Sequence, residues 1–251
     1  MNTPPAPLRD RAVPLGRKPV ISREDIIEAA LKLVGPHRSV STLSLREVAR
    51  EAGIAPNSFY RQFRDMDELA VALIDRAGRS LRRIIGEARH RANSGQSVVR
   101  GSVEAFMRQL RSDDKLLHML LREGTVGSAA YKQAVERELL SFEDELRQDL
   151  IRLAQGNRNG LYEPAVTAKA ITRLVFAMGT TAMDLPDEKH AEWADQLELM
   201  LRMIIVGTQT LAARPELAGR TTAESVVIKP EPASVAPASP TGLPPAESAG
   251  R

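Results

Sequence analysis

The chain lacks cysteine and has few aromatic residues. In 251 residues there is no cysteine, which excludes disulfides, a thiol nucleophile and metal sites built on thiolates. Aromatic residues make up only 4% of the chain, a composition that favours helices over sheets. No stretch approaches 18 uninterrupted apolar residues, so we expect no membrane-spanning segment. The first 20 residues lack the apolar core of a secretory signal, so we expect a cytoplasmic protein.

Recognisable catalytic motifs are also missing. Histidine occurs only four times, with neither a cluster nor the H-E-x-x-H spacing of zinc enzymes. No glycine-rich phosphate loop, nucleophile elbow or paired-carboxylate motif stands out. We therefore expect no enzyme activity, no metal and no cofactor.

Positive charge is concentrated in the N-terminal quarter, although the net charge is only +3. Residues 1–64 contain 11 Lys and Arg against 6 Asp and Glu, a balance of +5. Residues 65–220 contain 22 against 23, a balance of −1. This asymmetry predicts a polyanionic partner for the N-terminal quarter. A solvated basic face is the alternative interpretation.

The periodicity of apolar residues predicts an all-α chain in four parts. We expect a flexible basic arm at 1–20, a small helical domain at 21–66, a larger helical domain at 67–213, and a disordered tail at 214–251. The motifs described below indicate DNA binding for the first domain, and the resemblance named after them implies effector binding and dimerisation for the second. The tail is rich in Pro, Ala and Ser and cannot bury enough apolar surface to order itself. Helices are predicted near 97–111, 114–124, 128–155, 164–184 and 188–213, and no strand of useful length is expected.

Helix starts are signalled by short polar patterns. Ser22 with Asp25 and Ser44 with Glu47 have the spacing of capping boxes. Asp67 is the expected cap of a longer fourth helix.

Residues 44–63 read as a helix, a tight turn at Gly53 and a short second helix. This order is typical of the helix-turn-helix, whose second helix lies in the DNA major groove. Phe59 and Phe63, four residues apart, are expected to anchor that helix in the core. The leading turn, Pro56-Asn57-Ser58, is compact enough to approach base edges, and Asn57 can both donate to and accept from adenine.

Further residues around this motif suit the phosphate backbone. Tyr60 offers a hydroxyl, and the second helix of the domain begins at Ser44 with free backbone N–H groups. The predicted DNA-binding residues are Ser44, Arg46, Pro56, Asn57, Ser58, Tyr60, Arg61 and Arg64, together with Arg17 and Lys18 in the arm.

The stretch LSLREVAREAGIAPNSFYRQFRDMDEL resembles the DNA-binding signature of TetR-type bacterial repressors. The resemblance covers about 20–213 and implies a TetR-like fold: a three-helix DNA-binding domain, a helical ligand-binding domain and a dimer formed by the last two helices. Together with LLREGTVGSAAYKQAVERE, it is most similar to the FabR/DesT regulators of fatty-acid desaturation, which respond to acyl-CoA or acyl carrier protein thioesters. Many members carry a phosphate-binding lysine where this chain has Met66, and Arg64 is a candidate replacement.

The remaining helices contain the candidates for an apolar effector site. These are Phe106, Met119, Arg122, Phe176 and Met178. For each apolar member, ordinary core is the favoured alternative, whereas Arg122 can equally be part of an ion pair at a helix end. A homodimer is predicted through the helices near 164–184 and 188–213, because the first has small residues for close approach and the second has more apolar residues than one buried stripe needs.

These features predict a DNA-binding transcriptional regulator, a repressor of genes of lipid or unsaturated fatty-acid metabolism. Its expected partners are double-stranded operator DNA, a hydrophobic effector such as a long-chain acyl-CoA, and a second copy of the chain. Two alternatives remain: a TetR-type repressor of an efflux or catabolic operon that responds to another hydrophobic ligand, and a helical interaction protein with no DNA role.

Overall fold

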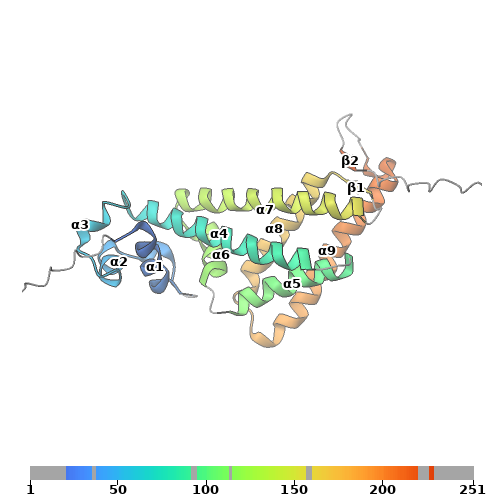
Figure 1. Ribbon diagram of the computed structural model, residues 1–251. Helices are drawn as coiled ribbons and strands as arrows, with labels where there is room; N and C mark the ends of the chain where they lie inside the picture. Colours follow the sequence, from blue (N-terminus) through green and yellow to red (C-terminus); the bar gives the residue numbers. More distant parts are fainter. Residues whose placement is uncertain are drawn as a thin grey trace, which may run out of the picture. The chain divides into compact units, whose positions relative to one another are not determined.

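A computed structural model describes residues 21–35, 38–91, 95–112, 115–156, 160–219 and 226–228. Figure 1 shows the helical elements along the chain. The α-helices are α1 (Arg23–Leu33), α2 (Leu45–Glu51), α3 (Pro56–Phe59), α4 (Met66–Arg91), α5 (Gly95–Arg111), α6 (Lys115–Val126), α7 (Ala129–Gly156), α8 (Pro164–Ala182) and α9 (His190–Ala213). Short 3-10 helices are η1 (Val40–Thr42), η2 (Asp187–Lys189) and η3 (Pro215–Ala218). Among the described helices, none has the length and apolar character needed to cross a membrane.

The described residues group into two compact units. One contains the residues up to Arg83 together with Gln109–Glu138, and the other contains Ile84–Arg108 together with the residues from Leu139 onward. The long helices α4 and α7 each contribute residues to both units. In the structure, α4 groups with α1–α3 as far as Arg83. The boundary predicted between residues 66 and 67 therefore remains a proposal about which part of the chain binds DNA and which part binds the effector.

The first unit has a core of aliphatic and aromatic side chains. Ile26 of α1, Val48 of α2, Phe59 of α3 and Leu73 of α4 are completely buried. The apolar positions of α1 and α4 recur at helical spacing, so each helix places one stripe in this core. The core thus joins the three short helices to the first half of α4.

Gly78 allows α4 and α7 to pack closely, although glycine is a poor helix former. A Cβ at Gly78 would lie 1.9 Å from Oε2 of Glu138 on α7. Glu138 forms a largely buried ion pair with Arg82, one turn further along α4. Burial raises the pKa of Glu138, and the contact with Arg82 opposes that rise. The missing side chain at Gly78 is therefore what makes room for the carboxylate.

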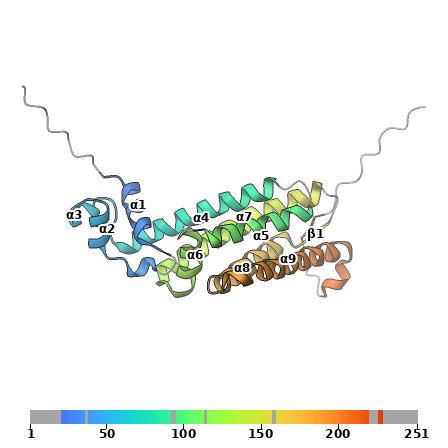
Figure 2. The ribbon, with the colours of Figure 1, turned by 90° about the horizontal axis from the view of Figure 1, so that it is seen from below.

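The second unit contains the adjacent helices α8 and α9, which lie side by side in Figure 2. Small buried residues on α8, Gly179 and Ala182, reduce its bulk. Several large apolar side chains of the pair remain exposed: Val166, Leu199, Met200, Met203 and Val206.

Three features differ from the sequence-based expectations. The first turn of α4 is capped by Asp65, whose Oδ1 accepts from the Glu68 amide at 2.8 Å, and not by Asp67, because the helix already begins at Met66. A short antiparallel pair joins β1 (Leu161–Tyr162) to β2 (Val227–Ile228).

The pairing of β2 also changes the interpretation of the C-terminal segment. Residues 215–219 and 226–228 belong to the described part of the chain, so the expectation of disorder from residue 214 onward does not hold for them. Val227 and Ile228 are β-branched, a property that favours a strand. The strand is held further by Glu163, whose amide donates to the Val226 carbonyl at 2.8 Å and whose Oε1 accepts from the Val226 amide at 3.0 Å.

Candidate nucleic-acid interface

The capping box predicted at the start of α2 is present. The amide of Glu47 donates to Ser44 Oγ at 3.3 Å, and the amide of Ser44 donates to Glu47 Oε2 at 3.0 Å. Arg38 forms a 2.7 Å ion pair with Glu47. The hydrogen bond from Arg38, with smaller contributions from Ser44, lowers the pKa of Glu47 to about 2. The beginning of α2 is therefore fixed by local contacts and by the preceding loop. The predicted box at Ser22 and Asp25 on α1 is also present.

Gly53 makes the turn between α2 and α3. Its φ of +68° lies in the left-handed region, which glycine adopts without the clash of a Cβ. Two backbone hydrogen bonds close the turn: the Gly53 amide donates to the Arg50 carbonyl, and the Ile54 amide donates to the Ala49 carbonyl. Pro56 then occupies the first position of α3, where its missing N–H costs nothing.

The short helix α3 is anchored by the two phenylalanines predicted for this role. Phe59 and Phe63 are 0% and 1% exposed, and their rings stack with centroids 5.6 Å apart. The guanidinium carbon of Arg23 lies 4.0 Å from the centroid of the Phe63 ring, a cation–π contact. A four-residue helix cannot hold itself together, so these contacts define its position.

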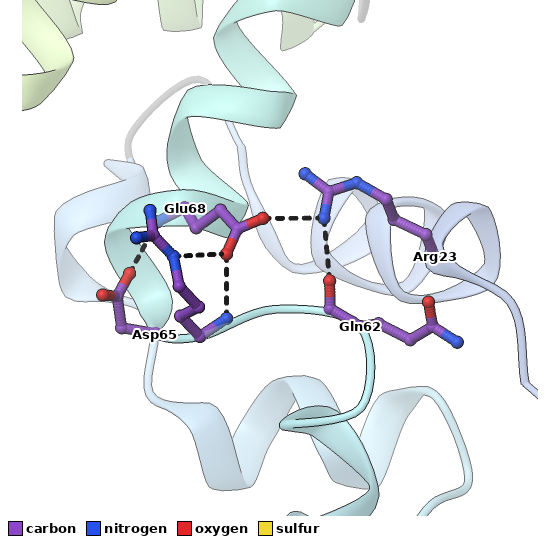
Figure 3. Close-up of polar contacts among 5 residues, drawn as sticks. Arg23, Gln62, Asp65 and Glu68 are labelled. Carbon is purple, nitrogen blue, oxygen red and sulfur yellow. Dashed lines mark hydrogen bonds and ion pairs between the residues drawn. The ribbon is translucent and has the colours of Figure 1, made fainter.

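A polar clamp around the connection between α3 and α4 was not predicted from the sequence. Figure 3 shows Arg23 of α1 reaching both the Gln62 carbonyl at 2.8 Å and Glu68 Oε1 on α4 at 2.9 Å. The other Glu68 oxygen accepts from the Arg64 amide at 2.9 Å. This hydrogen bond, followed by the one from Arg23, lowers the pKa of Glu68 to about 2. The contact between Arg23 and Glu68 spans 45 positions, so no local pattern could reveal it.

The opposite face of α3 is open to solvent. Tyr60 is 59% exposed, Pro56 and Asn57 are exposed, and Ser58 is half-buried. The two phenylalanines thus face the core while the polar residues face outward, as the sequence predicts.

The nearby cations differ in their surroundings. Arg46 and Arg61 are exposed and form no ion pair with any residue that the structure describes. Arg64 is paired with Glu68 at 3.2 Å, yet its side chain is 86% exposed. Met66 is half-buried at the first position of α4. Arg17 and Lys18 lie outside the described residues.

Helix α6 supports the connection between α1 and α2 at two points. Lys115 Nζ donates to the carbonyls of Leu31 and Lys32 at the end of α1, at 3.3 and 3.1 Å. Glu123 is completely buried, and its Oε1 accepts from Ser39 Oγ at 2.6 Å and from the Val40 amide at 2.9 Å. The ammonium group of Lys115 thus lies at the carbonyl end of α1, and the carboxylate of Glu123 lies at the N–H end of η1. This is the favourable placement of charges at helix ends.

The predicted effector residues occur in both units, and the two phenylalanines among them contact other aromatic rings. Phe106 is buried and stacks on Trp193, with ring centroids 6.3 Å apart. Phe176 is half-buried and makes an edge contact with Phe142. Met119 is buried, and Arg122 and Met178 are half-buried. The two ring partners, Trp193 and Phe142, could not be predicted from the sequence, because single aromatic residues on a helix carry no distinguishing pattern. An effector site formed by the five predicted residues remains a prediction.

Comparisons with known proteins agree with this arrangement. Residues 26–73 match the family model described as "Bacterial regulatory proteins, tetR family". The structure of reduced NemR from E. coli is similar, with a TM-score of 0.58 and 18% identity, over 73% of this chain and 96% of that chain. FadR from Bacillus halodurans, a fatty acid degradation regulator, has a TM-score of 0.58 and 15% identity, over 74% and 95% of the two chains.

A third similar structure is AibR in complex with isovaleryl coenzyme A and operator DNA, with a TM-score of 0.53 and 15% identity, over 71% of this chain and 97% of that chain. At these identities the likeness concerns the fold. The chain therefore has a TetR-like fold, and its residues 26–73 match the tetR family of bacterial regulatory proteins.

Proposed function

We propose that this protein is a DNA-binding transcriptional regulator that places α3 in the major groove of operator DNA. The observation that carries the proposal is the division of α3 into a buried aromatic side and an exposed polar side. A helix fixed on one side by Phe59, Phe63 and the Arg23 clamp can present its other side to DNA without losing order. The match of residues 26–73 to the tetR family supports the same function.

The exposed residues suggest a division between base and phosphate contacts. Asn57 and Ser58 lie in the leading turn of α3, where a side chain can reach base edges, and Pro56 keeps that turn compact. Tyr60 and the unpaired cations Arg46 and Arg61 suit phosphate oxygens. Ser44, Arg64 and the arm residues Arg17 and Lys18 complete the proposed DNA-binding set.

The regulator acts as a homodimer in this proposal. Leu199, Met203 and Val206 of α9 are each at least 59% exposed, and Val166 of α8 is 61% exposed. Monomeric proteins rarely expose several large apolar residues on neighbouring helices. A second copy packed on α8 and α9 would cover them as a four-helix interface, and a two-fold dimer would match paired half-sites in the operator.

The effector in this proposal is an apolar molecule bound by the second domain, with an acyl-CoA as the preferred class. Phe106, Met119, Phe176 and Met178 offer apolar surface, and Arg122 offers a charge for a polar end. Two structural relatives support a lipid-related ligand: one is crystallised with isovaleryl coenzyme A, and another is titled a fatty acid degradation regulator. The target genes would then belong to lipid or unsaturated fatty-acid metabolism, with repression relieved or strengthened by effector binding.

A small aromatic effector is the second candidate, because RolR, crystallised with resorcinol, has the same fold at a TM-score of 0.54 and 20% identity. Native mass spectrometry of compounds that copurify with the protein separates the two. An acyl thioester supports the lipid proposal, and an aromatic compound contradicts it.

The test of DNA binding is a salt titration with two variants. The protein is expected to bind duplex DNA with an affinity that falls steeply as salt rises, because phosphate contacts release counterions. Asn57→Ala is expected to lose about tenfold in affinity on operator and little on random DNA, whereas Tyr60→Phe should weaken both equally. Equal losses for Asn57→Ala on the two DNAs would contradict base reading. No binding at low salt would overturn the function.

A further inference from the structure

The first turn of α9 contains two buried polar side chains without hydrogen-bond partners. His190 and Trp193 are 7% and 5% exposed. Within the described part of the chain, no hydrogen bond satisfies Nε1 of Trp193 or either ring nitrogen of His190. The carboxylate of the highly exposed Asp187 lies 3.5 Å from His190 Nδ1 and forms an ion pair with it only if the ring is protonated.

The two side chains occur together and beside an aromatic wall. A spacing of three residues places His190 and Trp193 on the same side of α9. Trp193 stacks on Phe106 of α5, with the ring planes 17° apart. Phe106 is also one of the residues that the sequence indicates for effector binding. Polar ring nitrogens and apolar ring faces are therefore combined in one region of the second unit.

The chemistry of the unpartnered atoms defines what could satisfy them. A buried donor without a partner is destabilising, so an unsatisfied group of this kind calls for an explanation, and a bound molecule is one that supplies the hydrogen bond. The indole N–H of Trp193 can only donate, and the imidazole of His190 offers at least one N–H in every protonation state. A bound molecule that satisfies both side chains must therefore bring acceptor atoms, such as the oxygens of a carbonyl or carboxylate. An alkylammonium group can only donate, so it could reach an acceptor nitrogen of His190 but could not satisfy the indole N–H of Trp193.

We propose that His190 and Trp193 bind the acyl oxygen of an apolar ligand, while Phe106 packs against its hydrocarbon part. This inference rests on the proposed function, in which the second domain binds an effector, and it names the residues that recognise the effector's polar group. The oxygen is supplied by a free fatty acid or by an acyl thioester, two sources of the same carbonyl chemistry.

The single tryptophan of the chain provides an atom-level test. The full-length protein, labelled with ¹⁵N, has one indole N–H resonance, which can be followed while octanoate, octanoyl-CoA or octylamine is added. Octanoate or octanoyl-CoA is expected to shift this resonance in a saturable way, and whichever does so identifies the acid or the thioester as the ligand form. Octylamine has the same chain and no acceptor oxygen, so it should leave the resonance unchanged.

Two substitutions then test the hydrogen bonds. Trp193→Phe and His190→Phe keep an aromatic ring and remove the N–H, and each should raise the Kd of the bound acyl compound about tenfold in calorimetry. Glu192→Gln changes an exposed neighbour on the same turn and should leave that Kd unchanged. If either variant fails to fold, as judged by circular dichroism, the resonance titration of the unmodified protein decides the question.

Three results would overturn the inference: no shift with either acyl compound, an equal shift with octylamine, or an unchanged Kd in both folded ring variants. DNA binding of the same preparation keeps this test apart from the proposed function. Salt-dependent DNA binding without acyl binding leaves the regulator proposal standing and removes the site. Acyl binding without DNA binding supports the acyl site and contradicts the regulator proposal.

Discussion

Helices α1–α3 and the pair α8–α9 are held in different ways. Around α3, polar side chains bind backbone atoms: Arg23 donates to the Gln62 carbonyl, and Glu68 accepts from the Arg64 amide. In α8 and α9, small buried residues permit close packing, and large apolar residues such as Met203 remain on the outside. The first arrangement fixes a short helix whose exposed surface is polar. The second leaves an apolar surface that needs a cover. The chain thus holds a short polar-faced helix rigidly in one region and leaves apolar side chains of α8 and α9 exposed in another.

The largest expected effect is on dimerisation, and it comes from placing charges on the exposed apolar surface of α9. Met203→Asp combined with Val206→Asp would place two carboxylates in the proposed dimer interface, where desolvation is costly. Because these side chains are 66% and 59% exposed in one chain, the fold itself should be unaffected. The dimer Kd is expected to rise at least a hundredfold, measured by analytical ultracentrifugation.

The matched control for this double variant is Glu192→Asp, an exposed position near the beginning of α9 that already carries a carboxylate. It should leave the mass unchanged. A double variant that sediments as the unmodified protein does would place the interface elsewhere.

The next effect concerns the contact between α6 and the segment at Ser39 and Val40, within the first unit. Glu123→Ala leaves the buried Val40 amide and the Ser39 hydroxyl without their acceptor. Loss of an acceptor for a buried donor costs about 1–3 kcal/mol, and we expect the free energy of unfolding to fall by about 2 kcal/mol. Urea denaturation followed by circular dichroism measures the change.

Glu123→Gln is the informative comparison, because the amide retains one carbonyl oxygen for the same two donors. Its unfolding free energy should fall by about 1 kcal/mol or less. Equal losses in the two variants would mean that the carboxylate charge, and not the acceptor, is what the first unit needs.

A smaller effect on the free energy of unfolding is expected at acidic pH. It should depend on Glu68 near α3 and not on the ion pair in α9. The folded-state pKa of Glu68 is lowered to about 2 by the Arg64 amide and Arg23. A lowered folded pKa means that the unfolded chain binds the proton more tightly, so this contribution to stability is complete above about pH 4.5 and is lost as the pH falls towards 2. Glu68→Gln should therefore lower stability at pH 7 and flatten the decline between pH 4.5 and 2.

The acid experiment compares melting temperatures of the unmodified protein and Glu68→Gln across this pH range. Glu198→Gln, which removes a carboxylate from the ion pair with Arg202 on α9, is the control in the other region. If Glu68→Gln shows the same acid slope as the unmodified protein, the clamp around α3 does not contribute to stability in solution.

The sequence predicts contacts between residues a few positions apart, but it does not predict contacts between residues that are distant in the chain. Capping at Ser44 depends on a residue three positions away, and anchoring by Phe59 and Phe63 on residues four apart, so both follow from spacing. The burial of Glu123 depends on Ser39, 84 positions earlier in the chain. A partner at that distance leaves no periodic pattern in the sequence, and a glutamate in a helix is ordinarily interpreted as solvent-exposed.

The same reasoning explains the smaller errors. Asp65 and Asp67 are both suitable caps, and only the observed start of α4 at Met66 distinguishes them. The strand at Val227–Ile228 has too few residues to show alternation, and its partner Leu161–Tyr162 lies more than 60 positions away. For the effector residues, a buried phenylalanine in a core and one beside a ligand have the same sequence pattern. Contacts such as the stack of Phe106 on Trp193 become visible only in three dimensions.

The smallest predicted effect addresses Met66, the position at which the TetR-type signature that this stretch resembles often has a phosphate-binding lysine. Met66 is half-buried at the first position of α4, next to the exposed surface that includes Arg64. Met66→Lys would add a cation there, and the expected gain in affinity for any duplex DNA is about threefold to tenfold at low salt. The slope of log K against log salt should become steeper by about 1, as expected for one more phosphate contact. Arg64→Ala should produce the opposite change if Arg64 serves this contact in the unmodified protein. If Met66→Lys leaves the slope unchanged while Arg64→Ala reduces it, the exposed Arg64 guanidinium already occupies the phosphate position, and the methionine is a consequence of that replacement.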